Sequence, residues 1–243
     1  MLTKEALIIK LKESKDVAVL TGAGISAESG VPTFRGKDGL WRQYRAEELA
    51  TPQAFAANPK LVWEWYDWRR SIIHPLSPNA AHLTIAKLEK YYDKFTVITQ
   101  NVDGLHAKAG SKNIIELHGN IWKVQCIVEG NVMENYEVPL KEIPPKCKCN
   151  ALLRPYIVWF GEPLHPYTFE NAVAAVESAQ ILLVIGTSAI VQPAASLPII
   201  AKEYNKIVVE INIDDTPLTP IVDLSIKGKA AEVIPSLFSW LPT

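Results

Sequence analysis

Short apolar runs, several rich in β-branched residues, alternate along the chain with longer stretches of mixed apolar and polar residues. Such runs are typical of buried strands, whereas apolar positions at a 3.6-residue period are typical of helices. We expect strands at 17–20, 95–99, 113–117, 181–185 and 206–211, a core-like extended stretch at 156–160, and helices at 3–16, 79–92, 168–179 and 194–204. Because strands alternate with helices, the pattern predicts an α/β fold, with a Rossmann-like parallel sheet and helices on both of its faces.

Two segments depart from this alternation. Residues 37–78 are helix-like and loop-rich, with Pro52 and Pro59 interrupting, and residues 119–154 contain three cysteines and no long helical pattern. We therefore predict a discontinuous larger domain formed by residues 1–36, 79–118 and 155–243. The helical insertion 37–78 and a zinc-ribbon-like insertion 119–154 are expected to form a small second domain.

Composition narrows the class of protein. The 243 residues are 48% hydrophobic and 21% charged, which is typical of a globular protein with a large core. A formal net charge of -1 gives no general attraction to nucleic acid, and no apolar run approaches the ~20 residues that cross a bilayer. The charged N-terminal stretch is unlike a secretory signal, so we expect a cytoplasmic protein with neither membrane nor direct nucleic-acid partners.

The turn after the first predicted strand has the spacing of a phosphate-binding loop. Gly22, Gly24 and Ala27 match G-x-G-x-x-G/A, in which the bare glycines let backbone N–H groups approach a pyrophosphate. The match is weak by itself, because a plain strand-to-helix turn can have the same spacing. An ordinary dehydrogenase would need an acidic residue after a second strand, roughly 20 residues on. That place is taken by residues 31–42, a glycine-bearing stretch without strand character.

Small or hydrogen-bonding residues follow each of the predicted strands. These stretches are 21–24, 99–104, 116–120, 186–188 and 211–212. Because the carboxyl ends of parallel strands meet at one edge of a sheet, we expect a polar ligand site there.

Several of these stretches resemble a known family in identity and order. Residues 22–26 (GAGIS), 34–36 (FRG), 99–106 (TQNVDGLH), 116–119 (ELHG), 158–162 (VWFGE) and 186–188 (GTS) resemble motifs of the sirtuins. Sirtuins are NAD-dependent protein-lysine deacylases. The resemblance covers about residues 17–234 and implies that the larger domain binds NAD.

The resemblance implies roles for individual residues. It places the cofactor on Gly22, Ala23, Gly24, Glu28, Phe34, Arg35, Gln100, Asn101, Asp103, Gly186, Thr187, Ser188, Asn212 and Ala230. Asn101 and Asp103 are also expected to act in catalysis, with the Asp103 carboxylate accepting from the nicotinamide carboxamide.

His118 is the expected general base. In sirtuin chemistry the acyl oxygen of the substrate lysine attacks the anomeric carbon as nicotinamide leaves, and a ribose hydroxyl must then lose a proton. Histidine, with a pKa near ~6.5, suits that transfer. His106 is expected to have a structural or pocket-wall role, and His74, His82 and His165 are expected at the surface or in packing.

The resemblance also implies a binding site for the substrate. An acylated-lysine protein would add an extended strand beside Val158, Phe160, Gly161 and Glu162. Tyr66 and Arg69, at i and i+3 of a helix-like stretch, resemble the pair that binds malonyl and succinyl carboxylates in one sirtuin subgroup. Ala46 is small enough to leave room for the acyl group. The structural alternative is that this helix-like stretch only packs its aromatic residues in the core, with no role in binding the acyl group.

The cysteines depart from the family pattern of two Cys-x-x-Cys pairs. Cys126 is followed three residues later by Glu129, and the second pair is Cys147 and Cys149. Three thiolates and a carboxylate can hold structural zinc, because carboxylate oxygens are acceptable zinc ligands. The alternative is a degenerate module held by apolar packing.

The function predicted is therefore an NAD-dependent protein-lysine deacylase, acting on acetyl-lysine and on short dicarboxylic acyl groups. The alternatives are a mono-ADP-ribosyltransferase, which shares the first bond cleavage, and a non-catalytic NAD-binding module.

Overall fold

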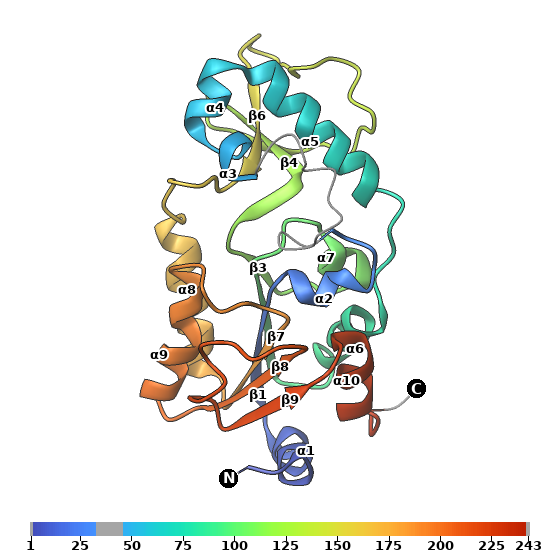
Figure 1. The fold of residues 1–243 in the computed structure, drawn as a ribbon, viewed down its shortest axis with the longest axis vertical. Helices are drawn as coiled ribbons and strands as arrows, with labels where there is room; N and C mark the ends of the chain where they lie inside the picture. The colour runs from blue at the N-terminus through green and yellow to red at the C-terminus, as the bar shows by residue number, and fades with distance from the viewer. Residues whose placement is uncertain (1, 33–45, 242–243) are drawn as a thin grey trace.

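A six-stranded parallel sheet forms the larger part of the molecule in the computed structural model, which describes residues 2–32 and 46–241 (Figure 1). Its strands are β1 (Asp16–Thr21), β2 (Lys94–Thr99), β3 (Ile114–Glu116), β7 (Ile181–Ile185), β8 (Ile207–Asn212) and β9 (Leu224–Lys227). They lie in the order β3-β2-β1-β7-β8-β9, with every neighbouring pair parallel. This strand order is that of a Rossmann fold, so the predicted fold class is confirmed.

Helices cover both faces of this sheet. One face carries α1 (Lys4–Glu13), α6 (Ala80–Leu88) and α10 (Ala230–Leu237), and the other carries α8 (Pro166–Ser178) and α9 (Leu197–Glu203). Successive residues of β1 alternate between the two cores: Val17 and Val19 pack with the first group, Ala18 and Leu20 with the second. A strand buried on both faces explains the unbroken apolar runs of the sequence.

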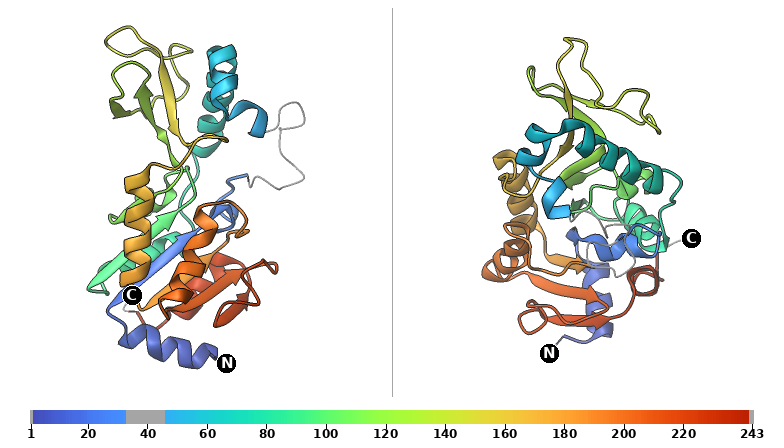
Figure 2. Two further views of the ribbon diagram at one scale, coloured as in Figure 1. Left: turned by 90° about the vertical axis from the view of Figure 1, so that its left-hand side faces the viewer. Right: turned by 45° about the horizontal axis from the view of Figure 1, so that its top comes forward.

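A smaller antiparallel sheet lies beyond the carboxyl ends of the parallel strands (Figures 1 and 2). It consists of β5 (Val132–Glu134), β4 (Gly119–Cys126) and β6 (Leu153–Ile157), and packs with α4 (Pro52–Ala57) and α5 (Pro59–Ile73). The short helix α3 (Ala46–Leu49) precedes α4. Thr51 and Asn58 cap α4 and α5, so each interrupting proline occupies the first turn of a helix. We call these strands and α3–α5 the small module.

The structure corrects the expectation for residues 156–162. Strand β6 ends at Ile157 and pairs with β4, so this stretch belongs to the smaller sheet. The chain then turns at Phe160–Gly161, where the Glu162 N–H donates to Trp159 O (2.9 Å). The expectation of an extended segment through Glu162 is therefore wrong. The domain limits stay a proposal. Strand β6 runs across the limit that we expected between residues 154 and 155.

Helix α2 (Ala23–Ala27) follows the glycine turn, and further elements were not expected from the sequence pattern. Among them are α7 (Leu105–Ala109), β9 and α10. Helix α2 opens from the glycine turn, as the phosphate-loop spacing indicated, and α7 lies within the 99–106 motif. Short elements give a weak periodic signal, because one or two turns of helix do not complete the apolar pattern.

Candidate active site

The turn after β1 packs directly against the turn after β7. Gly22 N–H donates to Ile185 O (3.0 Å), and Gly24 N–H donates to Gly186 O (2.8 Å). A Cβ on Gly22 would lie 2.8 Å from Gly186 O, and one on Gly24 would lie 2.7 Å from Gly186 Cα. Glycine is therefore required here by contact between the two turns, in addition to any approach of a phosphate. The predicted opposite walls, 22–24 and 186–188, are thus brought together.

The loop after β2 contributes two amide side chains to the same edge of the sheet. Gln100 Nε2 donates to Thr187 Oγ1 (3.0 Å), which links β2 to the turn after β7. Asn101 Nδ2 donates to Gly22 O (3.0 Å) and to Ser26 Oγ (3.2 Å). These predicted cofactor residues form one hydrogen-bonded edge with the glycine turn.

Asp103 is buried, with 5% of its surface exposed. Its Oδ1 accepts from the Leu105 N–H at the start of α7 (2.8 Å). Burial raises the pKa of Asp103, opposed by the hydrogen bonds from Leu105 and Ser26 and by the positive charge of Arg69. A carboxyl group in these surroundings is poised to accept a hydrogen bond from a neutral amide, as the expected nicotinamide contact requires.

His118 lies in the short link between the two sheets, after β3 ends at Glu116 and before β4 begins at Gly119. Its Nδ1 is 3.1 Å from Gln100 O, and its own carbonyl accepts from Val158 N–H (3.0 Å). A carbonyl can only accept, so Nδ1 carries the proton and Nε2 holds the lone pair. Burial lowers the pKa of His118, partly offset by this hydrogen bond. The neutral, basic form is therefore favoured at neutral pH.

Ser26, His82 and His106 form a buried polar chain that the sequence did not indicate. Ser26 Oγ lies 3.3 Å from His82 Nε2, and the two imidazole centroids are 4.9 Å apart. His106 Nε2 lies 3.0 Å from Thr21 Oγ1. Burial lowers the pKa of His82 to about 4 and that of His106 to about 3, so both are neutral. His82 is buried in packing, as expected, and it contacts Ser26, which also accepts a hydrogen bond from Asn101. The only sequence signal for this contact is that Ser26 belongs to the glycine motif.

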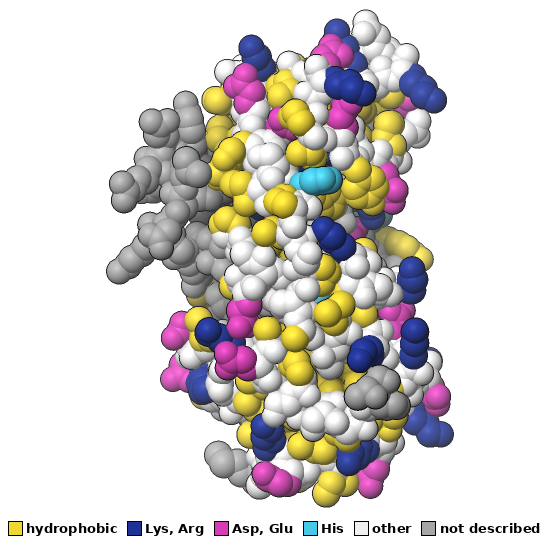
Figure 3. Space-filling view, turned by 90° about the vertical axis from the view of Figure 1, so that its right-hand side faces the viewer, with side chains coloured by type: hydrophobic (Ala, Val, Ile, Leu, Met, Phe, Trp, Pro, Cys, Tyr) yellow, Lys and Arg dark blue, Asp and Glu magenta, His cyan; other side chains and the backbone are white. Residues whose placement is uncertain are grey.

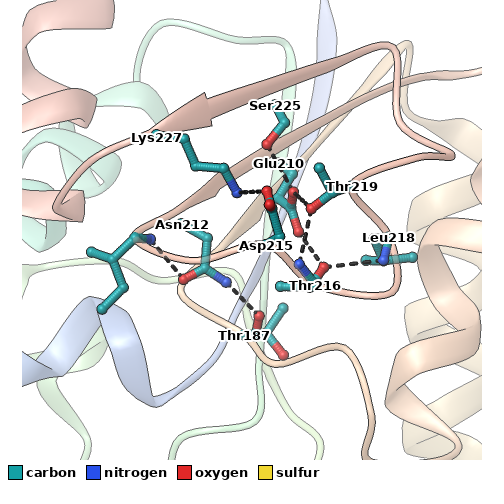
Figure 4. Close-up of polar contacts among 10 residues, drawn as sticks. Thr187, Glu210, Asn212, Asp215, Thr216, Leu218, Thr219, Ser225 and Lys227 are labelled. Atoms are coloured by element: carbon teal, nitrogen blue, oxygen red, sulfur yellow. Dashed lines mark hydrogen bonds and ion pairs between the residues drawn. The ribbon is translucent and has the colours of Figure 1, made fainter.

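Asn212 and Glu210 organise the carboxyl end of β8 (Figure 4). Asn212 Nδ2 donates to Thr187 O (2.7 Å), so the expected ribose-binding residue joins the same wall. Glu210 is 1% exposed and its carboxylate accepts from three hydroxyls. These hydroxyls belong to Thr216, Thr219 and Ser225. They fasten the loop after Asn212 onto the strand.

Other predicted cofactor residues are less central. Glu28 Oε2 accepts from the Ala231 N–H (2.8 Å), and this bond fixes the start of α10 next to the buried Ala230. Phe34 and Arg35 lie outside the described residues. Ala46 begins α3, but its side chain is likewise outside the described part of the structure.

Tyr66 and Arg69 share one face of α5. The Tyr66 hydroxyl is fully buried and accepts from Trp159 Nε1 (2.9 Å). Burial raises the pKa of Tyr66 to about 12, so the hydroxyl keeps its proton. The Arg69 guanidinium lies 5.1 Å from the Trp65 ring centroid, and burial lowers its pKa against the opposing effect of Tyr66 and Asp103. Arg69, a candidate for the acyl pocket, and Asp103, a candidate for the nicotinamide pocket, are thus close enough to affect each other's pKa.

Glu162 has a structural partner. Its carboxylate binds both terminal nitrogens of Arg154 (2.7 and 2.8 Å) and accepts from the Trp159 N–H (2.9 Å). Burial raises the pKa of Glu162, but the hydrogen bonds from Arg154 and Trp159 outweigh it and the pKa is lowered. The Arg154 guanidinium also lies 3.7 Å from the Trp159 ring centroid. This clamp shapes the turn that the substrate is expected to meet.

Cys126, Glu129, Cys147 and Cys149 converge in the small module. One ligand atom from each lies within 4.8 Å of the others. The Cys126 and Cys149 sulfurs are 3.6 Å apart, and Cys147 Sγ is 3.6 Å from Glu129 Oε2. Zinc–sulfur bonds of about 2.3 Å in a tetrahedron put sulfur atoms nearly this far apart. The three cysteines and the glutamate therefore fit a structural zinc ion.

The fold and the polar edge are typical of one class of protein: a Rossmann-like dinucleotide-binding enzyme, here with a second module that contains a candidate metal site. A model of the Sir2 family matches residues 22–193. The NAD-dependent protein deacylase of Aquifex aeolicus is 54% identical over 230 residues, covering 94% of this chain and 96% of that protein. NAD-dependent protein deacylase 1 of Archaeoglobus fulgidus is 53% identical over 234 residues, covering 96% of each.

Solved structures agree. A Sir2 homologue–NAD complex superimposes with a TM-score of 0.92 at 52% identity, covering 97% of this chain and 93% of that one. A Sir2 complex with a p53 peptide and NAD+ gives 0.86 at 32% identity, covering 98% of both chains. The chain belongs to the Sir2 family. It is an NAD-dependent protein deacylase, and the predicted family, activity and cofactor are confirmed.

In the described part of the chain, no helix has the length and apolar character to span a bilayer.

Proposed function

We propose that His118 is the general base of the deacylation. The observation that carries this is the Nδ1 contact with Gln100 O (3.1 Å), which leaves the basic Nε2 with no hydrogen-bond partner among the described residues. NAD supplies the ADP-ribosyl group that accepts the acyl group as nicotinamide is released. His118 Nε2 takes the proton of a ribose hydroxyl, and Asn101 and Asp103 hold the nicotinamide end.

The test compares acetyl-, malonyl- and succinyl-lysine peptides incubated with NAD, with products followed by mass spectrometry. The native chain should give free lysine, nicotinamide and O-acyl-ADP-ribose. His118→Ala should lower kcat/KM by about 10²- to 10⁴-fold. Because the pKa of His118 is lowered, the acid limb of the native pH profile should lie below pH ~6.5. NAD consumption with every peptide still acylated would favour the mono-ADP-ribosyltransferase.

We propose that the protein substrate is bound as an extended segment beside Val158. Solved Sir2 structures that contain a p53 peptide support this class of partner. In this chain the N–H groups of Val158 and Phe160 donate to His118 O and Ala50 O, and that of Trp159 donates to Glu162. These N–H groups are already bonded, so a substrate peptide can pair with this segment only by donating its own N–H groups to the carbonyl oxygens of the segment, or by pairing beyond the turn.

The expected absence of direct nucleic-acid and membrane partners stays a prediction. On the face seen in Figure 3, lysine, arginine and acidic side chains are interspersed, which supports a protein substrate over a phosphate backbone. The cytoplasmic location also stays a prediction, supported by three free cysteines that suit a reducing compartment.

We propose that Tyr66 and Arg69 bind the carboxylate of malonyl or succinyl groups. Trp159 already donates to the Tyr66 oxygen, so the hydroxyl proton is available to an acceptor, and Arg69 adds a charge. Arg69→Met should abolish most desuccinylation, about 100-fold in kcat/KM, while deacetylation changes less than about 3-fold. Equal loss of both activities would refute the carboxylate role.

We propose that Glu129 is the fourth zinc ligand. Metal analysis of the purified protein should give one zinc per chain. Glu129→Ala should release zinc to a chelator faster than Glu129→Cys, which restores a fourth thiolate. Equal release rates would exclude the glutamate as a ligand and leave the three thiolates.

A further inference from the structure

Trp122 connects the small module to the loop that carries Asp103. It lies on β4, is 9% exposed, and its indole Nε1 donates to the Asp103 carbonyl oxygen (2.8 Å). One residue earlier on β4, the Ile121 N–H donates to Val102 O (2.8 Å). The loop is thus held from the main sheet through Gln100 and Asn101, and from the small module through Val102 and Asp103.

The indole also fits against the bare backbone of Gly104. Gly104 has φ +76°, and a Cβ there would lie 2.8 Å from Trp122 Cδ1. The ring is fixed on its other sides by the Arg70 guanidinium, 5.3 Å from its centroid, and by His74 and Tyr136, each 6.0 Å away between ring centroids. Trp122 therefore sits in a defined place and sets the orientation of the peptide group after Asp103.

Orientation of this peptide matters for the carboxylate. Asp103 Oδ1 accepts from the Leu105 N–H, and Ser26 also hydrogen-bonds the Asp103 side chain, so the carboxylate offers a ligand only its remaining lone pairs. The direction in which it points follows from the backbone on either side of Asp103. A buried carbonyl that loses its donor costs free energy, and the loop would relax to find another.

We propose that Trp122 is a positioning residue for the nicotinamide end of the site, acting through the Asp103 main chain. This rests on the proposed role of Asp103. Any large apolar side chain at position 122 of β4 could serve packing alone, but only the indole N–H reaches the loop.

The test is Trp122→Phe, which keeps an aromatic ring and removes the donor. The matched control is Trp63→Phe: Trp63 is also buried in the small module, and its Nε1 donates to Leu153 O (2.7 Å), away from the loop. Loss of one buried hydrogen bond corresponds to about 3- to 10-fold. Trp122→Phe should raise KM for NAD by that factor, with kcat and the Kd of ADP-ribose within about 2-fold. Trp63→Phe should leave all three within about 2-fold.

A Trp122→Phe enzyme that behaves like Trp63→Phe, or one that loses ADP-ribose and NAD binding equally, would overturn the proposal. The variant Asp103→Asn distinguishes failure of this proposal from failure of the proposed role of Asp103. An unchanged KM for NAD in Asp103→Asn would show that Asp103 does not bind the nicotinamide end. If Trp122→Phe does not fold, Tyr136→Ala removes only a 60% exposed ring stacked on the indole. It should raise KM for NAD more than Trp63→Phe does, and a change no larger than that of Trp63→Phe would count against the proposal.

Discussion

The parallel sheet and the small module are held together in different ways. The sheet buries contiguous apolar strands on both faces, so its core is made by many equivalent contacts. The small module also has an apolar cluster, but specific polar, aromatic and sulfur contacts cross it. They include Trp63 to Leu153 O, Tyr66 to Trp159, Arg154 to Glu162, and the cysteine cluster.

This difference teaches where each part of the site gets its precision. Distributed apolar contacts tolerate substitution and bring the carboxyl ends of the strands together. Hydrogen bonds from Gln100 and Asn212 to Thr187 then join the loops at that edge. Single directional bonds place individual side chains such as Tyr66 and Trp159. Losing one such bond should therefore affect one substrate group and leave the fold largely intact.

Removing the proposed zinc ion should have the largest effect and should separate the two regions. Structural zinc sites contribute on the order of 10 kcal/mol, far more than any single side-chain contact. After chelation, hydrogen exchange should accelerate in β4, β5 and β6, while amides of β1, β7 and β8 stay protected. Faster exchange throughout both sheets would contradict the separation.

A cavity in the main sheet should come next. Leu183 is fully buried in β7, so Leu183→Ala should lower the free energy of unfolding by about 2–5 kcal/mol. Urea unfolding followed by circular dichroism measures this. Leu83→Ala, at a side chain that is 48% exposed, should change it by less than about 0.5 kcal/mol. Similar losses in the two variants would argue against a burial-driven sheet.

Acid should weaken the parallel-sheet region, where His82 and His106 are buried beside Thr21 and Ser26. His82 and His106 have folded pKa values of about 4 and 3, below the ~6.5 of an unfolded chain. Between pH 6.5 and 4 the unfolded state binds more protons, so stability falls as pH falls, by up to about 1.4 kcal/mol per pH unit per histidine. Urea midpoints across this range measure the slope. His82→Asn should flatten it and the exposed His165→Asn should not; equal slopes would exclude the buried pair as the cause.

The smallest effect concerns the loop after β8, next to Asn212, which we expect to bind the ribose. Glu210→Gln keeps the shape of the side chain but weakens its bonds to three hydroxyls, and should cost about 1–3 kcal/mol of stability. Because Asn212 is two residues away on the same face of β8, calorimetry should also detect weaker ADP-ribose binding. Ser225→Ala, which removes one donor, should lose less. Full ADP-ribose affinity in Glu210→Gln would show that the loop is not needed to place Asn212.

The sequence by itself determined the sheet, its polar edge and the family. Apolar runs such as 181–185 form strands because a fully buried strand needs no alternation, and the residues after them carry the family motifs. The convergence of Cys126, Glu129, Cys147 and Cys149 was also predicted, because closely spaced cysteines and carboxylates are typical of a metal site.

Only the tertiary structure decided which distant side chains meet. Ser26 and His82 are 56 residues apart in sequence and 3.3 Å apart in space, and Trp122 reaches Asp103 across the boundary between the two sheets. The contact of Gly24 with Gly186 likewise joins residues far apart in the sequence. The ion pair of Glu162 with Arg154 depends on the backbone turn that precedes Glu162. Local patterns fix the period of each element, but the partner of a buried polar group depends on how whole elements pack, and no single stretch of sequence contains that information.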